Sequence, residues 1–303
     1  MRKLLLIPIK LCNTLYYWVS NKDNVLVVNA SVFQFLSKTR HFNLGDDLNV
    51  YMLKELTGKR VFVNNQFYHR PMRSYMCIGS VMDWMANEQT SVWGAGIITP
   101  PLQQQAINKL QAANILAVRG AYTRNLLIEN GISCPAVYGD PALLLPYLFN
   151  PKVRKVRNRI GFIPHFYDKN NKNVERLLKE CEGDGILIKI QGYENWHETI
   201  RQILSCDYII SSSLHGLILS DAYGVPNLWV SFSDLLKGGL FKFNDYYTSV
   251  GKTTERVEVT ENTHIKELIE KKRHYININF DPKPLLRACP FTITHPIIKD
   301  LAK

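Results

Sequence analysis

One stretch of the chain places a proton carrier at a position suited to binding anions. Residues 211–226 read Ser-Ser-Ser-Leu-His-Gly-Leu-Ile-Leu-Ser-Asp-Ala-Tyr-Gly-Val-Pro, with apolar runs before and after them. The pattern predicts a strand, a tight turn, a helix that ends at Gly224, and another strand. His215 then lies in the first turn of that helix, where unpaired backbone amides and the helix dipole attract phosphate or carboxylate. Because an imidazole can also move a proton near neutral pH, this segment predicts a reactive site.

Other polar residues and glycines follow other predicted strands, and the carboxyl ends of parallel strands share one edge of a sheet. They are Asn43, Gly45, Asp46, Gly94, Gly96 and Arg119 in the first half of the chain, and His165, Ser211, Ser212 and Ser213 in the second. Each has a structural alternative, such as a helix cap for Asn43 or Ser213 and an ion pair for Arg119. For each residue alone, the structural role is the more common one. Because all of them follow predicted strands and would face the same side of the fold, we expect them to line one shared cleft.

The elements that would position these residues alternate between strand and helix. Strands are expected at 24–30, 60–64, 75–80, 91–94, 115–119, 160–164, 186–190, 208–211, 227–230 and 257–260. Helices are expected at 48–56, 102–113, 122–130, 174–181, 197–204, 214–223 and 264–274. Two such arrays in series predict an α/β protein with two Rossmann-like domains, whose parallel sheets face a central cleft.

The basic cluster Lys152–Arg159 is the best boundary between the two arrays. It divides the chain into an N-terminal domain, 1–150, and a C-terminal domain, 151–285. The remaining tail, 286–303, is expected to be irregular with a final helix and to pack back on the first domain.

Composition and charge limit the partners. The 303-residue chain carries a net charge of +11, which favours anionic partners such as phosphates or an anionic membrane surface. We expect no nucleic acid, because no recognition motif is present, and no metal, because Asp46, Asp47 and Asp140 lack a His or Asp at ligand spacing. The six cysteines form no CxxC pair, which is typical of reduced thiols in a cytoplasmic protein.

The segment 1–20 is apolar and basic. Pro8 and Lys10 interrupt its apolar run, so it is too short and too broken to span a membrane, and it lacks a cleavage site for a signal peptide. Two interpretations stay open. The segment is either a helix packed on the first domain or an interfacial helix that touches a membrane surface with Tyr and Trp at headgroup depth.

Several short motifs, taken in order, resemble the polysaccharide pyruvyl transferase family. They are Asn43-Leu44-Gly45-Asp46-Asp47, Gly94-Ala95-Gly96, Val118-Arg119-Gly120, Gly139-Asp140-Pro141-Ala142, Ile163-Pro164-His165, Ser212-Ser213-Leu214-His215-Gly216 and Phe243-Asn244-Asp245-Tyr246-Tyr247. The resemblance covers about residues 24–250. Its most specific parts are the Ser-Leu-His-Gly block and the Asp-Ala-Tyr-Gly-Val-Pro continuation.

The resemblance implies a GT-B-like fold with the acceptor on the first domain and the donor on the second. It implies a bacterial pyruvyltransferase of exopolysaccharide or capsule biosynthesis that uses phosphoenolpyruvate as donor substrate and needs no cofactor. A lipid-linked oligosaccharide is the implied acceptor, and the implied location is the cytoplasm, peripheral at the inner face of the cytoplasmic membrane.

The family motifs also imply residue roles. His215 is expected to be the catalytic residue and Arg119 an anion ligand. The other expected donor-binding residues are Ser212, Ser213, Leu214, His165 and Lys242, and the expected acceptor or cleft-lining residues are Asn43, Gly45, Asp46, Gly94 and Gly96. Some family members have Arg where this chain has Ser213, so the donor's charge must be met elsewhere, by Arg119, Lys237 or Lys242.

The proposed chemistry suits an imidazole at an anion site. Ketal formation delivers a proton to the vinyl carbon of phosphoenolpyruvate and removes protons from two sugar hydroxyls, while phosphate leaves. A helix N-terminus alone would lower the pKa of His215, and bound phosphate and carboxylate would raise it again. We therefore expect His215 to become an acid only once the donor is bound.

Two rival functions remain open. A GT-B glycosyltransferase would use Asp221 to hold the ribose of a nucleotide sugar, although the second acidic residue expected upstream is missing. A non-catalytic scaffold at a membrane-bound complex would not explain why His215 and Arg119 both follow strands. The aromatic residues that could stack on acceptor sugars are Tyr167, Tyr193, Trp196, Tyr246 and Tyr247.

Overall fold

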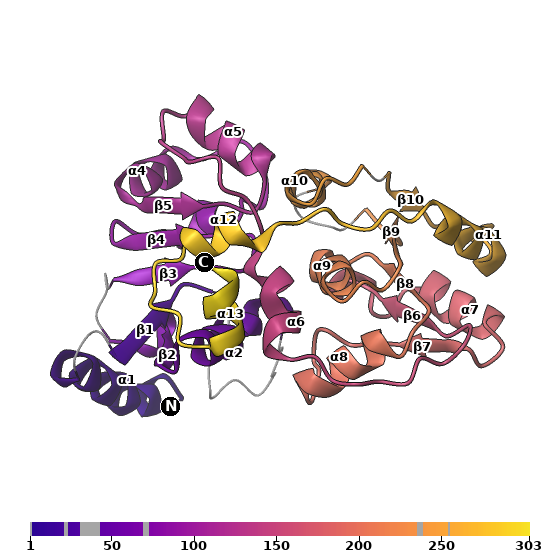
Figure 1. The fold of residues 1–303 in the computed structure, drawn as a ribbon, viewed down its shortest axis with the longest axis horizontal. Helices are drawn as coiled ribbons and strands as arrows, with labels where there is room; N and C mark the ends of the chain where they lie inside the picture. Colours follow the sequence, from indigo (N-terminus) through magenta and orange to yellow (C-terminus); the bar gives the residue numbers. More distant parts are fainter. Residues whose placement is uncertain (1, 21–23, 31–42, 69–72, 235–238, 254) are drawn as a thin grey trace.

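A computed structural model describes residues 2–20, 24–30, 43–68, 73–234, 239–253 and 255–303. It contains two five-stranded parallel sheets side by side, each with its helices (Figure 1). The prediction of an α/β protein with two Rossmann-like domains is confirmed.

The first sheet has the strand order β2-β1-β3-β4-β5. Its strands are β1 (Val25–Val28), β2 (Arg60–Val63), β3 (Ser74–Met76), β4 (Thr90–Trp93) and β5 (Asn114–Ala117). The helices of this half are α1 (Arg2–Val19), α2 (Leu44–Thr57), α3 (Met82–Met85), α4 (Gln104–Ala112), α5 (Ala121–Glu129) and α6 (Leu145–Leu148). The strands are short apolar runs such as Val-Leu-Val-Val in β1, which is fully buried, as expected for a parallel sheet covered on both faces.

The second sheet has the order β10-β9-β8-β6-β7. Its strands are β6 (Ile160–Ile163), β7 (Gly185–Leu187), β8 (Tyr208–Ser211), β9 (Asn227–Ser231) and β10 (Val257–Glu258). Its helices are α7 (Lys172–Glu180), α8 (Trp196–Leu204), α9 (Leu214–Ala222), α10 (Phe241–Ser249) and α11 (Ile265–Glu270). Counted within its own sheet, each half therefore has the order 2-1-3-4-5, in which ligands bind beyond the carboxyl ends of the first and third strands.

The C-terminal segment returns to the first sheet (Figure 1). It is more regular than the sequence predicts, because both α12 (Pro282–Arg287) and α13 (Pro296–Leu301) are helical. The indole of Trp93 donates to the carbonyl of Leu285 at 2.7 Å, and the backbone N–H of Thr294 donates to the carbonyl of Leu56 at 2.8 Å. The chain thus crosses from the second array back to the first at about residue 282.

The largest buried cluster runs through both halves of the molecule. It joins Leu44 and Leu48 of α2 to Leu214 and Leu217 of α9, all at most 5% exposed. The backbone N–H of Leu44 also donates to the carbonyl of Ile190 at 2.8 Å. These contacts hold the first turn of α2 beside the first turn of α9, which is the arrangement that forms the site.

Helix α1 lies at the outer edge of the first sheet, on the side away from the second (Figure 1). Among the described residues, no helix combines the length and the apolarity that crossing a bilayer requires. All six cysteines are free thiols.

Candidate active site

A pocket of about 180 Å³ opens between the two sheets, where the strand order places the ligand sites. The first domain contributes Asn43, Asp46, Ser80, Val81, Trp84 and Ile98, and the second contributes His165, Gln191, Ser213, Leu214, His215 and Lys242. The second-domain residues lie in the loops and first turns after β6, β7 and β8 and on α10. Both halves of the molecule are therefore needed to complete the pocket.

His215 is the second residue of α9, with Ser213 at the N-cap, as the sequence predicts. The Ser213 side chain makes no capping hydrogen bond, so the first-turn amides of α9 are not capped by it. The amides and the helix dipole together favour an anion at this end of the pocket.

The imidazole of His215 is held between two neighbours. Its Nε2 lies 4.0 Å from Oδ2 of Asp140, and both atoms are buried with no hydrogen-bond partner. On another side the ring packs against Gly45, where an added Cβ would lie 2.0 Å from Nδ1. The distance to Asp140 exceeds a hydrogen bond, but catalytic hydrogen bonds commonly shorten only when substrate binds.

Asp140 is positioned by the turn that follows it. Its Oδ1 accepts from the backbone N–H of Ala142 at 2.9 Å, which caps the short 3₁₀ helix Pro141–Leu144. That helix packs against α9 and so brings Asp140 to His215. Only Oδ2 is left without a partner, and it is the oxygen that faces the imidazole.

Burial shifts the pKa values of this cluster toward the neutral forms. It lowers the pKa of His215 to about 3, with smaller contributions from the positive charges of Arg119 and Lys242. It raises the pKa of Asp140 to about 7. Without a bound anion, burial therefore favours the neutral imidazole of His215 and raises the protonated fraction of Asp140 near neutral pH. The sequence-based argument expected a lowered pKa for His215 from the helix dipole, whereas burial is the larger cause.

The remaining charged groups of the pocket are perturbed in the same way. Burial raises the pKa of Asp46 to about 7, and the neighbouring Asp47 adds to the effect. Burial lowers the pKa of Lys242 to about 8 and that of His165 to about 4. A cluster of strongly shifted pKa values in one pocket is typical of a catalytic site.

Asn43 and Asp46 bond to each other across the start of α2. Asn43 is the N-cap residue but makes no capping bond; its Nδ2 instead donates to Oδ2 of Asp46 at 2.6 Å. Asp47 turns the other way and accepts a hydrogen bond from the hydroxyl of Tyr193 at 2.7 Å. The Asn43–Asp46 pair thus faces the pocket, while Asp47 links α2 to the second domain.

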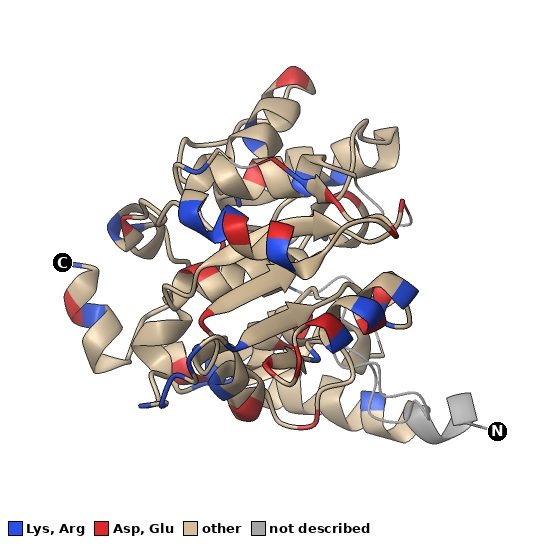
Figure 2. Ribbon diagram, turned by 90° about the vertical axis from the view of Figure 1, so that its right-hand side faces the viewer, with Lys and Arg blue, Asp and Glu red and all other residues tan. Residues whose placement is uncertain are grey.

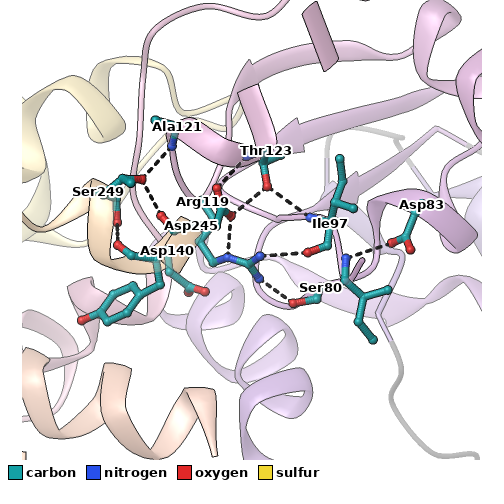
Figure 3. Close-up of polar contacts among 12 residues, drawn as sticks. Ser80, Asp83, Ile97, Arg119, Ala121, Thr123, Asp140, Asp245 and Ser249 are labelled. Carbon is teal, nitrogen blue, oxygen red and sulfur yellow. Dashed lines mark hydrogen bonds and ion pairs between the residues drawn. The ribbon is translucent and has the colours of Figure 1, made fainter. Parts of the chain in front are cut away.

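The structure places Arg119 in the ion pair that the sequence left open as an alternative to an anion ligand. Its side chain is fully buried and is not part of the pocket lining. Its Nε donates to Oδ2 of Asp245 at 2.8 Å, and its other nitrogens donate to Ser80 and to the carbonyl of Ile97 (Figure 3). Arg119 acts from behind the pocket, because Asp245, brought in by α10, holds its guanidinium there.

Four other predicted residues also lie outside the pocket lining. Ser211 is buried; its hydroxyl donates to the carbonyl of Ile163 at 2.9 Å and accepts from the backbone N–H of Ser213 at 3.0 Å. Ser212 is buried; its hydroxyl donates to Asp168 at 2.7 Å and accepts from the backbone N–H of His165 at 2.9 Å. Gly96 lies against the Arg119 guanidinium, and Gly94, at φ +96°, lies against Gly139 and Pro141, on either side of Asp140. The two serines therefore support the walls of the site through hydrogen bonds, and the two glycines allow its walls to pack closely.

The other predicted residues meet at the pocket. Asn43, Asp46, His165, Ser213, Leu214, His215 and Lys242 line it, and Gly45 touches the His215 ring. Lys237 lies outside the described residues. No group of three or more His, Cys, Asp or Glu side chains in the described part of the chain is placed to hold a metal ion.

The sequence argument missed several residues of the site. Ser80, Trp84, Ile98 and Gln191 line the pocket, and Asp140 faces His215 from outside it. Asp140 left a signal in the sequence, because a Gly-Asp-Pro turn directly follows an extended segment. The others left none, since they lie on loops or a short helix.

Comparisons with known proteins identify the family of this chain. Residues 62–234 match the sequence model of the polysaccharide pyruvyl transferase family. The chain belongs to this family. The match runs from β2 to just after β9 and includes most of the residues that line the pocket. The protein is therefore a polysaccharide pyruvyltransferase.

Two curated relatives are similar over most of the chain. One is the uncharacterized protein L143 of Acanthamoeba polyphaga mimivirus, 30% identical over 69% of this chain and 71% of that protein. The other is the succinoglycan biosynthesis protein ExoV of Rhizobium meliloti (strain 1021), 27% identical over 78% of this chain and 71% of that protein. Among solved structures, an uncharacterized protein from Klebsiella pneumoniae matches with a TM-score of 0.48 and 12% identity, over 83% of this chain and 99% of that one.

Proposed function

We propose that this pyruvyltransferase forms a pyruvate ketal on a sugar of a surface polysaccharide or its lipid-linked precursor, using phosphoenolpyruvate and releasing phosphate. The observation that carries the proposal is the placement of His215. Its ring borders a pocket at a helix N-terminus, and its buried Nε2 faces a buried carboxyl. The named role of ExoV in succinoglycan biosynthesis supports an exopolysaccharide as product.

The pocket offers two kinds of partner to a donor with a phosphate and a carboxylate. The first-turn amides of α9 can donate to one anionic group, and the ammonium of Lys242 can bind the other. Arg119 adds a fixed positive charge from behind, through Ser80, which lines the pocket. These groups take the place of the arginine that stands at the Ser213 position in some family members.

Proton transfer follows from the charge state of the Asp140–His215 pair. An anion in the pocket stabilises the imidazolium and raises the pKa of His215, and the Asp140 carboxylate then forms its ion pair on the far side. The imidazolium delivers one proton to the vinyl carbon as the first sugar hydroxyl bonds to C2. The second hydroxyl then displaces phosphate from C2. One hydroxyl proton returns to the catalytic pair and the other leaves with phosphate, so protons balance.

The Asn43–Asp46 pair is proposed to face the acceptor. Asp46, with a pKa raised to about 7, can accept a proton from a sugar hydroxyl near neutral pH. Of the aromatic residues considered for sugar stacking, Tyr193, Tyr246 and Tyr247 are buried in the core and are unavailable. Trp84 is 56% exposed and lines the pocket, which makes it the better stacking surface for a sugar ring.

The glycosyltransferase alternative is weakened by the position of Asp221. That carboxylate is 2% exposed and accepts hydrogen bonds from four side chains. Its partners are Asn227, Tyr246, Lys252 and Tyr275. A carboxylate so fully bonded within the protein is not free to hold the ribose of a nucleotide sugar.

Free cysteines and the use of phosphoenolpyruvate as donor favour a cytoplasmic site of action, at the inner face of the cytoplasmic membrane if the acceptor is lipid-linked.

The deciding experiment measures phosphate release from phosphoenolpyruvate with a lipid-linked glycan extract as acceptor. Release should require the extract and should be lost in His215→Ala. The matched control is His264→Ala, because His264, the N-cap residue of α11, is 66% exposed and does not line the pocket. Consumption of a nucleotide sugar with no phosphate release from phosphoenolpyruvate would reverse the assignment.

A further inference from the structure

Helix α1 is docked on the first domain by a side that mixes one aromatic residue with polar ones. Its buried positions are Thr14 and Tyr17; the Tyr17 ring packs against Phe67, and the amide of Asn13 donates to the carbonyl of Gln66 at 3.1 Å. The Thr14 hydroxyl accepts from the backbone N–H of Tyr68 at 3.1 Å. An amphipathic helix of a soluble domain normally buries its apolar stripe instead.

The opposite side of α1 carries large apolar residues that are exposed. Val19 is 85%, Leu15 63% and Trp18 62% exposed. The other exposed apolar residues of the helix are Ile7, Ile9, Leu11 and Tyr16, each between 37% and 42%. Residues 7, 11, 15 and 18 follow each other at helical spacing, so they form one stripe. A contiguous apolar surface of this kind is unusual on a free monomer and indicates a binding surface.

The sequence of α1 carries only positive charges. Residues 1–20 contain Arg2, Lys3 and Lys10 but no Asp or Glu, and the part of the helix that Figure 2 colours shows no red. On the neighbouring strand β2, the exposed Arg60 has its guanidinium 4.7 Å from the centre of the Tyr16 ring. Apolar residues, Tyr and Trp beside cations, without acidic residues, are typical of helices that lie at the interface of an anionic membrane.

The same charges disfavour a second copy of the chain as the occupant. Pairing two α1 helices face to face would bring two positive surfaces together, and neither helix has a carboxylate to offset the repulsion. The length and composition of α1 also exclude a transmembrane role, because no helix among the described residues is apolar enough to cross a bilayer.

We propose that α1 binds the surface of an anionic lipid bilayer, lying in its plane with the Ile7–Trp18 stripe toward the acyl chains and the basic residues at the phosphates. Membrane affinity then has an apolar part and an electrostatic part. This binding is independent of the catalytic pocket and does not require the proposed donor or acceptor. It would concentrate the enzyme on the surface that holds lipid-linked substrates.

The test is co-sedimentation of the purified full chain with vesicles of phosphatidylcholine alone or mixed with phosphatidylglycerol. The wild type should bind the anionic vesicles and should bind them less at high salt. Leu15→Glu should lower the partition coefficient by about tenfold or more, because it replaces an apolar side chain that would enter the bilayer with a charge that anionic lipids repel. The matched control is Ile297→Glu, since Ile297 is 56% exposed on α13, and this variant should bind like the wild type.

Three outcomes would overturn the proposal. The first is that the wild type does not bind anionic vesicles. The second is that Leu15→Glu and the wild type bind them equally. The third is a concentration-dependent dimer in sedimentation equilibrium that Leu15→Glu dissociates, because it would assign the stripe to a second copy. Circular dichroism of each variant shows that the helix is folded.

Discussion

Gly45 lies against the imidazole of His215, and the substitution Gly45→Ala tests how far the reaction depends on the position of that ring. The new Cβ would lie 2.0 Å from Nδ1 and 2.3 Å from Cγ. Ordinary van der Waals contact begins at 3.4 Å, so the ring must move by about 1.4 Å. The obstacle is a side chain that can rotate, so the clash is relieved by displacing the imidazole from Asp140 rather than by unfolding.

The expected effect on the rate follows from this displacement. A misplacement of about 1 Å in a catalytic group commonly costs about 100-fold in rate, so kcat for phosphate release should fall by about 100-fold or more. Stability should fall by about 1–3 kcal/mol from overpacking, because Cγ of His215, close to the backbone, lies only 2.3 Å from the new Cβ; the helix propensity of alanine over glycine offsets up to about 1 kcal/mol of this. Thermal unfolding of Gly45→Ala and the wild type measures this change in stability.

A double-mutant cycle isolates the cause. If Gly45→Ala acts only through His215, then adding it to His215→Ala should not lower the residual single-turnover rate of that variant, measured at high enzyme concentration. Full activity in Gly45→Ala would refute the claim that the ring must stay where it is. Additive losses in the double variant would show that Gly45 acts on the substrate directly and not through the imidazole.

Three further predictions concern the buried charges. Asp140→Asn should lower kcat by about 100-fold with little change in KM for phosphoenolpyruvate, since Asp140 acts through His215; a change confined to KM would contradict this positioning role. Asp245→Ala leaves the fully buried Arg119 unpaired and should destabilise the fold by about 3–5 kcal/mol in urea denaturation, and a neutral result would mean that Arg119 finds another partner. Because burial lowers the pKa of His215 to about 3, that residue's contribution to stability is present above its unfolded value of 6.5 and is lost as the pH falls. His215→Gln should therefore lose less stability than the wild type between about pH 7 and about pH 4, and identical urea profiles would argue against a buried neutral imidazole.

The segment around His215 could be predicted from sequence because its signals are local. An apolar strand, a serine turn and a helix that ends at a glycine are all read within a few residues, and they fix His215 near a helix N-terminus. The same logic predicted that the loops after β6 and β8 meet, since parallel strands end on one side of a sheet. The N–H of His165 indeed donates to Ser212 across those loops.

The roles of Arg119 and Asp140 could not be predicted in this way. The partner of Arg119, Asp245, is 126 residues away in the sequence and on a helix that the periodicity did not indicate. A strand-end arginine is equally compatible with an exposed anion ligand and a buried ion pair until the second domain supplies the carboxylate. Asp140 carried a turn signal, but its orientation toward His215 depends on how its 3₁₀ helix packs against α9.

The two βα arrays, their parallel sheets and the polar residues at the strand ends follow from local patterns, because hydrophobic period and turn chemistry act over short distances. Which of those residues face the pocket, which lie behind it, and which side of α1 is exposed depend on tertiary packing. Exposure, pairing and pKa depend on what another part of the chain brings within a few ångströms. That proximity is set by packing between elements far apart in the sequence.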